Sequence, residues 1–98
     1  MRALPVEYSK NKMYYRMVLR NKTHAIYSLH EKENDKTPRG FEVIEIIHFK
    51  EDKHQKYGGQ TIVFEKGEYL PGNNQWGKLG WSYYTFKDAF IKFKGISE

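Results

Sequence analysis

The chain alternates between hydrophobic and polar positions in several short segments, and this pattern predicts β-strands. Residues 12–20 show the alternation most clearly. A period of two sends successive side chains to opposite faces of a sheet, so one row is expected to point inward and the other outward. The outward row then combines guanidinium groups with an aromatic ring. The inward row is Met13, Tyr15, Met17 and Leu19, and the outward row is Tyr14, Arg16, Val18 and Arg20.

A hairpin is expected next. Asn21-Lys22 suits a two-residue turn because Asn tolerates positive φ, and residues 23–30 are expected as the return strand. Residues 41–50 have the strongest strand signal, and their apolar residues on both faces are typical of a central strand. Glu45 interrupts one row and marks a candidate bulge. Shorter strands are expected at 60–65, 67–70 and 81–84, and loops at 31–40, 51–59 and 71–80.

Residues 85–94 show the period of an amphipathic helix. Thr85 can cap the helix, and Asp88 at the third helical position completes a weaker form of the capping box. Gly95 is expected to end the helix. Burial of the three phenylalanine rings contributes about 2 kcal/mol each, so the helix is expected to pack on the sheet. The apolar stripe, at spacings i, i+3, i+4 and i+7, is Phe86, Ala89, Phe90 and Phe93.

These elements predict an α+β fold with an antiparallel sheet of four to five strands and one C-terminal helix packed on one face. At 98 residues the chain is expected to form a single domain over 1–98. Within it, residues 1–11 are expected as an arm of uncertain order, 12–84 as the sheet and 85–94 as the helix. The hydrophobic content of 39% and the aromatic content of 16% are those of a folded domain.

Cysteine is absent, which excludes disulfides and zinc sites built on thiolates. The first residues carry no apolar run of signal-peptide length, and no apolar run approaches the roughly 20 residues of a membrane helix. We therefore expect a cytoplasmic protein that does not contact a membrane.

The net charge is +5, and it is concentrated near the start of the chain. Residues 1–30 contain six cationic side chains against the single acidic Glu7. A one-sided basic surface attracts polyanions or an acidic protein face. The alternative interpretation is that the charge only keeps a small protein soluble.

No arrangement of residues indicates catalysis. The serines lie in no nucleophile motif, and the glycines fit neither the Walker pattern nor the dinucleotide fingerprint. His24 and His30 lie six residues apart on one predicted strand, roughly 20 Å along it, which is too far to share a metal ion. We expect no catalytic residue, no metal, no cofactor and no small-molecule substrate, and hence a protein that is not an enzyme.

The predicted outward face of the first strand is the main candidate site. Cations that follow phosphates and rings that stack on bases together bind single-stranded nucleic acid. The alternative is an ordinary solvated sheet face. A second candidate is the glycine-rich segment 76–81, whose tryptophans either cover the core or form an exposed contact; Trp81 is expected to cover the core. The residues predicted to bind nucleic acid or a partner are Lys12, Tyr14, Arg16, Arg20, Lys22, Trp76 and Lys78.

The second half of the chain resembles small uncharacterised proteins of bacteriophages and mobile elements. The resemblance rests on the spacing of aromatics, glycines and a terminal helix across residues 40–94. It implies an accessory role in the cytoplasm of a bacterial host, and many phage proteins of this size inhibit host defence. The residues that carry the resemblance are Gly40-Phe41-Glu42-Val43, Pro71, Trp76-Gly77, Gly80-Trp81-Ser82-Tyr83, Thr85, Ala89 and Phe93.

A weaker, local resemblance is to the WGR domain, a nucleic-acid-binding module. Residues 11–16 resemble its first strand, 76–80 its signature, and 85–93 its following helix. Lys78 stands where the family has Arg, and more than fifty residues separate the first strand from the signature. This separation is far longer than the one found in the family.

The sequence therefore predicts a non-enzymatic, small basic binding protein that binds nucleic acid through a basic and aromatic sheet face. One alternative is a phage-type inhibitor that binds a host defence protein such as a CRISPR nuclease, through an acidic or apolar face of that protein. Another is a structural or assembly subunit that associates through its edge strands. The partner is thus a nucleic acid or a host protein, and the oligomeric state stays open.

Overall fold

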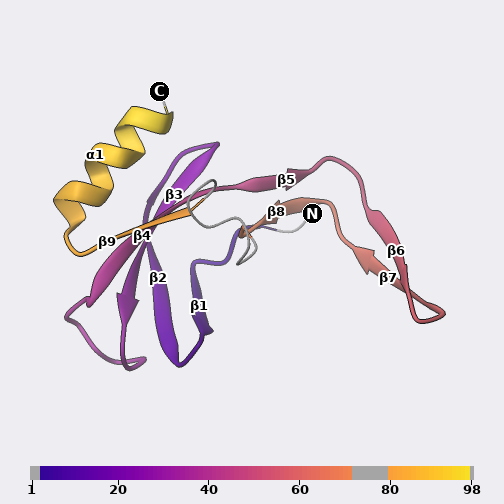
Figure 1. The fold of residues 1–98 in the computed structure, drawn as a ribbon, viewed down its shortest axis with the longest axis horizontal. Coiled ribbons are helices and arrows are strands. Elements are labelled where there is room, and N and C mark those ends of the chain that lie inside the picture. The colour runs from indigo at the N-terminus through magenta and orange to yellow at the C-terminus, as the bar shows by residue number, and fades with distance from the viewer. Residues whose placement is uncertain (1–2, 72–79, 98) are drawn as a thin grey trace.

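The computed structural model describes residues 3–71 and 80–97, and it confirms the α+β fold (Figure 1). Five strands form an antiparallel sheet in the order β1-β2-β3-β4-β9, and α1 packs against β3, β4 and β9. The elements are β1 (Glu7–Lys10), β2 (Met13–Arg20), β3 (His24–His30), β4 (Gly40–Glu45), β5 (Ile47–Phe49), β6 (Lys53–Tyr57), β7 (Gln60–Phe64), β8 (Gly67–Tyr69), β9 (Gly80–Tyr83) and α1 (Phe86–Ser97).

The helix begins as the sequence predicts and ends later. The Asp88 N–H donates a hydrogen bond to Thr85 Oγ1 at 3.2 Å, so Thr85 is the N-cap. Gly95 was expected to end the helix, and this prediction is wrong because α1 continues to Ser97. Ile96 packs against the core beneath the helix, and this burial offsets the roughly 1 kcal/mol that glycine costs inside a helix.

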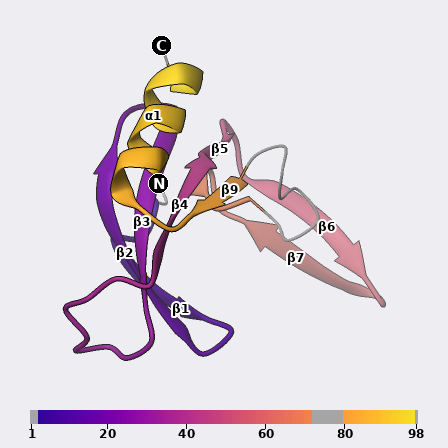
Figure 2. The same ribbon diagram turned by 60° about the vertical axis from the view of Figure 1, so that its left-hand side comes forward.

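The predicted strand over 41–50 divides into two strands that serve different sheets. β4 ends at Glu45, and the Ile46 N–H then donates to the Thr23 carbonyl oxygen at 2.7 Å. β5 leaves the main sheet and pairs with β8, and β6 pairs with β7. The two pairs form an arm that extends away from the five-stranded sheet, and the helix lies at the opposite end of the molecule (Figures 1 and 2).

The prediction of a loop over 51–59 is therefore wrong in part, because Lys53–Tyr57 form β6. This strand consists mainly of charged and amide side chains, so it shows no alternation of hydrophobic and polar positions. The turn that follows was predicted, and its two glycines have the positive φ angles that a tight turn requires, 55° at Gly58 and 84° at Gly59.

Residues 3–11 belong to the fold rather than to a flexible arm. Glu7–Lys10 form the edge strand β1, and Leu4 is buried in the core. The Tyr27 hydroxyl donates a hydrogen bond to the Pro5 carbonyl oxygen at 2.5 Å, which holds the segment before β1 against the sheet. Asn11 and Lys12, both at positive φ, form the turn into β2.

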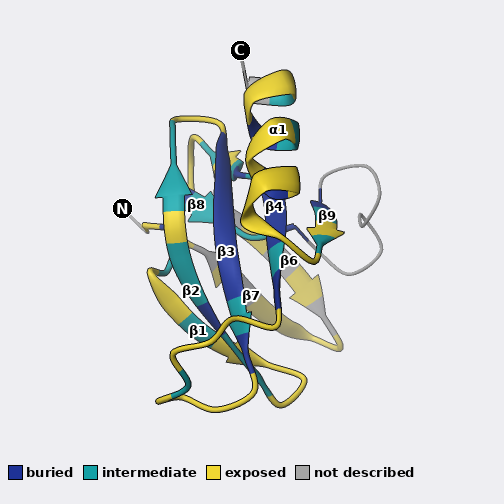
Figure 3. Cartoon of the chain, turned by 90° about the vertical axis from the view of Figure 1, so that its left-hand side faces the viewer, coloured by how far each residue is buried: buried dark blue, intermediate teal, exposed yellow. Residues whose placement is uncertain are grey.

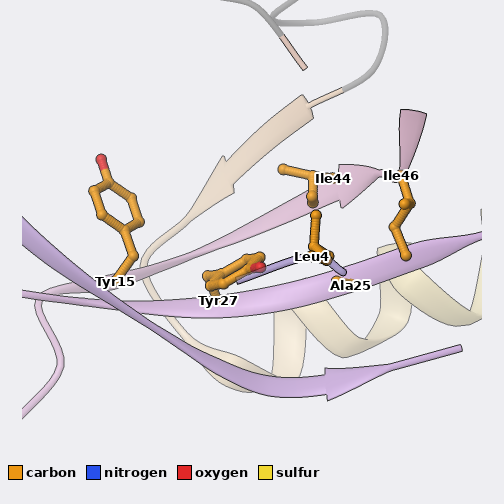
Figure 4. Close-up of a cluster of buried hydrophobic side chains, with 6 residues drawn as sticks. All are labelled: Leu4, Tyr15, Ala25, Tyr27, Ile44 and Ile46. Atoms are coloured by element: carbon orange, nitrogen blue, oxygen red, sulfur yellow. The ribbon is translucent and has the colours of Figure 1, made fainter. Parts of the chain in front are cut away.

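Both faces of the main sheet carry a hydrophobic core, and β3 is buried along almost its whole length (Figure 3). The core on the side away from the helix contains Leu4, Tyr15, Ala25, Tyr27, Ile44 and Ile46 (Figure 4). The core beneath the helix contains Ile26, Val43, Ala89 and Phe93.

One polar contact ties the arm to the sheet and to the start of the chain. Glu68 of β8 accepts hydrogen bonds from both terminal guanidinium nitrogens of Arg20, at 2.7 and 2.6 Å, and from the Leu4 N–H at 3.1 Å. The bond from Arg20 is the largest of the effects that lower the pKa of Glu68 from 4.5 to about 2. A carboxyl whose pKa falls on folding stabilises the fold above its unfolded pKa and loses that effect as the pH drops towards 2.

Replacing Glu68 by glutamine is expected to lower the free energy of unfolding at pH 7 by about 1.5–3 kcal/mol, the range for hydrogen bonds to charged groups. Urea denaturation measures the change, which should shrink between pH 5 and pH 2 as the wild-type carboxyl is protonated. Glu31→Gln is the control, because Glu31 pairs with Arg39 on the open surface and should contribute at most about 1 kcal/mol. Equal losses for the two variants at pH 7 would contradict this account of Glu68.

Candidate interaction surface

The basic face predicted for β2 does not form, because the strand contains a bulge. Met17 pairs with Tyr27 and Leu19 pairs with Ile26, so the register shifts by one residue between Met17 and Leu19. Directly opposed residues of antiparallel strands point to the same face, and one extra residue reverses the faces of the positions that follow. Leu19 accordingly packs in the core beneath the helix, although the alternation predicts it on the face of Met13, Tyr15 and Met17.

Arg16 and Arg20 therefore lie on opposite faces of the sheet. Arg16 is opposite Ser28 on the helix side, whereas Arg20 is opposite Ala25 on the other side. Arg16 donates to the backbone carbonyl oxygens of Asp35, at 3.1 Å, and of Glu33. Arg20 is held by Glu68. Each guanidinium is engaged within the protein, and the two do not share a surface.

The other predicted contacts are dispersed as well. Lys12 lies in the turn before β2 and Lys22 in the turn after it, so the eight-residue strand separates them by about 25 Å. Tyr14 is half-buried on the helix side, opposite His30. Trp76 and Lys78 lie outside the described residues. The structure thus corrects the prediction that one sheet face gathers these cations with Tyr14.

A different surface stands out by its hydrophobic exposure. The described residues include seven large hydrophobic side chains that are exposed, and four of these lie within 84–91. Their exposed fractions are 92% for Tyr84, 40% for Phe86, 37% for Phe90 and 61% for Ile91. With Phe41 of β4, which contacts Phe86, we call these residues the aromatic surface.

The position of α1 on the sheet explains this surface. Ala89 and Phe93 point into the core, and Phe86 and Phe90 lie on the flank of the helix. The expectation that all three helix phenylalanines are buried is therefore wrong. Of the four positions in the stripe, only Ala89 and Phe93 belong to the core that α1 forms on β3, β4 and β9.

The rings are ordered by contacts with one another. Phe41 meets Phe86 edge-on with centroids 5.7 Å apart, Phe86 lies 5.7 Å from Phe90, and Phe90 lies 6.4 Å from Phe93. These contacts form a continuous row from β4 to the buried side of the helix. Rings held in this way lose little conformational freedom when a partner covers them.

Cations border the aromatic surface. The helix carries Lys87, Lys92 and Lys94 against the single acidic Asp88. Lys92 Nζ lies 4.5 Å from the ring centre of Trp81, which packs on the core beneath the helix as predicted. On the other side, a shallow pocket of about 260 Å³ lies beside Tyr84, between β4 and β9. The residues that line it are Leu29, Arg39, Gly40, Phe41, Ser82, Tyr83 and Tyr84.

His24 and His30 are buried, whereas His48 and His54 are exposed. Among residues 3–71 and 80–97, no group of three or more His, Asp or Glu side chains is placed to hold a metal ion. His30 and Ser28 lie 2.8 Å apart between Nε2 and Oγ, but both are buried. In the same part of the chain, no helix is long and apolar enough to cross a membrane.

Sequence reasoning missed the aromatic surface because a helical stripe is ordinarily read as core. The signal that could have revealed it is Ile91, an apolar residue on the polar side of the helix pattern next to Phe90. No family model, curated protein or solved structure matches this chain.

Proposed function

We propose that this protein is a non-enzymatic binding protein that docks, through the aromatic surface, on an acidic and partly apolar region of another protein. The observation that carries the proposal is that, of the seven large hydrophobic side chains exposed among the described residues, four lie together at 84–91. Contiguous exposed apolar side chains are typical of interaction sites.

The composition of the surface supports a protein partner. Aromatic side chains are enriched at the centres of protein interfaces, where each can bury about 150–250 Å². The rings of Phe86 and Phe90 pack against neighbouring rings and leave edges and corners exposed, and Ile91 adds an aliphatic contact. Such a surface fits side chains of a partner better than it fits a series of stacked bases.

The charge of the surface indicates the character of the partner. The helix has three lysines and one aspartate, and the whole chain has a net charge of +5. Two copies docking through this surface would bring like charges together, so self-association is disfavoured. An acidic rim around an apolar centre is the complementary arrangement. That the partner is a host defence protein stays a prediction from the resemblance to phage proteins.

Site-directed photo-crosslinking in a lysate of the source cells tests the proposal. A photoreactive phenylalanine analogue in place of Ile91 should crosslink one protein through an acidic, apolar-containing segment. The same analogue in place of Val63, an exposed residue on the arm, is the matched control and should not crosslink that protein. Crosslinks to nucleic acid, to a second copy of this chain, or to no molecule at position 91 would each overturn the proposal.

Variants of the surface should then weaken binding to the purified partner. Tyr84→Ala and Ile91→Glu are each expected to lower the affinity at least tenfold, because truncating a central contact costs more than about 1.4 kcal/mol. Both side chains are exposed, so the fold should be retained. Val63→Glu should bind like the wild type in isothermal titration calorimetry. Unchanged affinity in both surface variants would contradict the assignment.

A further inference from the structure

A buried carboxylate lies on the face of the sheet away from the helix. Glu42 belongs to the interior strand β4, with Tyr27 of β3 on one side and Ser82 of β9 on the other. Residues opposed in this way share a face, so Glu42 points to the side of the Tyr27 core. Only 9% of Glu42 is exposed. A buried charge requires an opposite charge or hydrogen bonds beside it, or the group takes its neutral form.

Glu42 lies in the wall of a pocket of about 210 Å³. Tyr8 and Lys10 of β1 and Tyr15 of β2 line one side, and Ile44 and Leu70 line the apolar side. Tyr8 and Tyr15 stack with their ring centres 4.5 Å apart and their planes 3° from parallel. Tyr8 also meets Tyr27 edge-on at 5.2 Å, so the tyrosine wall is fixed in place.

The described residues do not compensate the charge of Glu42. Burial raises its pKa from 4.5 to about 7, and the attraction of Lys10 opposes this shift but is the smaller effect. None of the described residues donates a hydrogen bond that would lower the pKa further. The same carboxylate raises the pKa values of Tyr8 and Tyr15, although burial is the larger cause for both. Within 3–71 and 80–97, Lys10 is thus the one cation that acts on this buried acidic group, and its effect is smaller than that of burial.

We propose that this pocket binds an organic cation, a primary ammonium or a guanidinium group, with its charge against the Glu42 carboxylate. The ligand would supply the neutralisation that Lys10 provides only in part. Phenol oxygens and ring faces of tyrosine also attract cations. Phosphates and carboxylates would be repelled by Glu42, and the volume is below the roughly 300–1,000 Å³ of pockets for drug-sized ligands. A single ammonium or guanidinium group satisfies both the charge requirement and the volume limit.

This site is independent of the aromatic surface. Glu42 points away from the helix side, where Phe86 and Phe90 lie. A negative binding result for one of the two sites therefore does not contradict the other. The expectation from the sequence that no small molecule binds did not take a pocket of this kind into account, since Glu42 appears there only as one charged residue in an alternating strand.

The test uses the full chain and ¹H–¹⁵N NMR titration with methylguanidinium and with propylammonium at pH 8. We expect saturable shifts at Tyr8, Tyr15 and Glu42. Methylurea, the neutral analogue of methylguanidinium, should cause none. Glu42→Gln should weaken binding at least tenfold, and the amide fills the same space. The matched control is Glu45→Gln on the helix side, which should bind like the wild type.

The pH dependence of the affinity, a peptide ligand and the Tyr84→Ala variant test the proposal further. The affinity should fall about tenfold for each pH unit below 7 as Glu42 takes up a proton. Tighter binding of an arginine-containing tetrapeptide than of methylguanidinium would identify a protein side chain as the source of the cation, and equal or weaker binding would identify a free amine or guanidine. No saturable shift with any of the cations, or equal affinity in Glu42→Gln, would overturn the proposal. Tyr84→Ala should leave these titrations unchanged, which separates this result from the test of the aromatic surface.

Discussion

Replacing Tyr27 by alanine is expected to lower the free energy of unfolding by about 3–5 kcal/mol, a large share of the roughly 5–15 kcal/mol that stabilises a typical domain. Among the described residues Tyr27 is the largest side chain that is fully buried, and it belongs to the core away from the helix. Its ring contacts Tyr8 and its hydroxyl holds Pro5, so the substitution removes apolar contacts and leaves a cavity beneath β1.

The measurement is urea denaturation followed by circular dichroism. Tyr27→Phe is the matched variant because it keeps the ring and removes only the hydroxyl bond to Pro5; it is expected to lose about 1 kcal/mol. A loss below 1 kcal/mol for Tyr27→Ala would show that the start of the chain and β1 do not pack on this face as described.

Glu42→Gln is expected to stabilise the protein at pH 8 and to leave its stability unchanged at pH 4. The pKa of Glu42 rises from 4.5 to about 7 on folding, so the folded state binds the proton more tightly than the unfolded state. The contribution of Glu42 to stability is then most favourable below pH 4.5 and is lost as the pH rises through 7. Glutamine has no charge to bury, so the variant escapes a penalty on the order of 2–3 kcal/mol above pH 7.

Chemical denaturation at pH 4, 6 and 8 measures this difference. The neighbouring Tyr8 and Tyr15 have raised pKa values and do not titrate in this range. The control is Glu45→Gln on the opposite face, where the carboxylate is only half-buried. A difference between Glu42→Gln and the wild type that is the same at all three pH values would mean that Glu42 is not a buried group of raised pKa.

Local patterns predicted the elements that depend on local chemistry. A turn does follow β2 at Asn21-Lys22, but not for the predicted reason, because Asn21 does not adopt positive φ. Its side-chain Oδ1 instead holds the turn by accepting hydrogen bonds from the Thr23 and His24 N–H groups. The helix follows from its apolar period and from Thr85 as the cap. The antiparallel sheet with a helix on one face could be predicted from these pieces together.

The predictions that were wrong concern features that depend on residues distant in sequence. Met17, Val18 and Leu19 are all apolar, so nothing local marks the bulge between them; it arises from the pairing of β2 with β3. β1 is short and polar, and the segment before it is held by Pro5 and Leu4 through contacts with β3 and Glu68. Periodicity in one strand does not contain this information.

The binding sites were not predicted correctly for the same reason. A basic face on β2 required unbroken alternation from Arg16 to Arg20, and one extra residue reverses the face of Arg20. The aromatic surface depends on which positions of the helical stripe face the sheet, and this is decided by the packing of α1 on β3, β4 and β9 rather than by the period of the helix alone. Glu42, a charge in the middle of an interior strand, was the one visible sign of the pocket.

The central claim is that the bulge in β2 separates Arg16 from Arg20 and leaves the aromatic surface, rather than a basic sheet face, for recognition. Nuclear Overhauser contacts of the Leu19 methyl groups test it directly. The account predicts contacts from Leu19 to the side chain of Ile26, beneath the helix. Contacts from Leu19 to the ring of Tyr27 instead would place Leu19 on the opposite face, bring the two arginines to one side, and contradict the account.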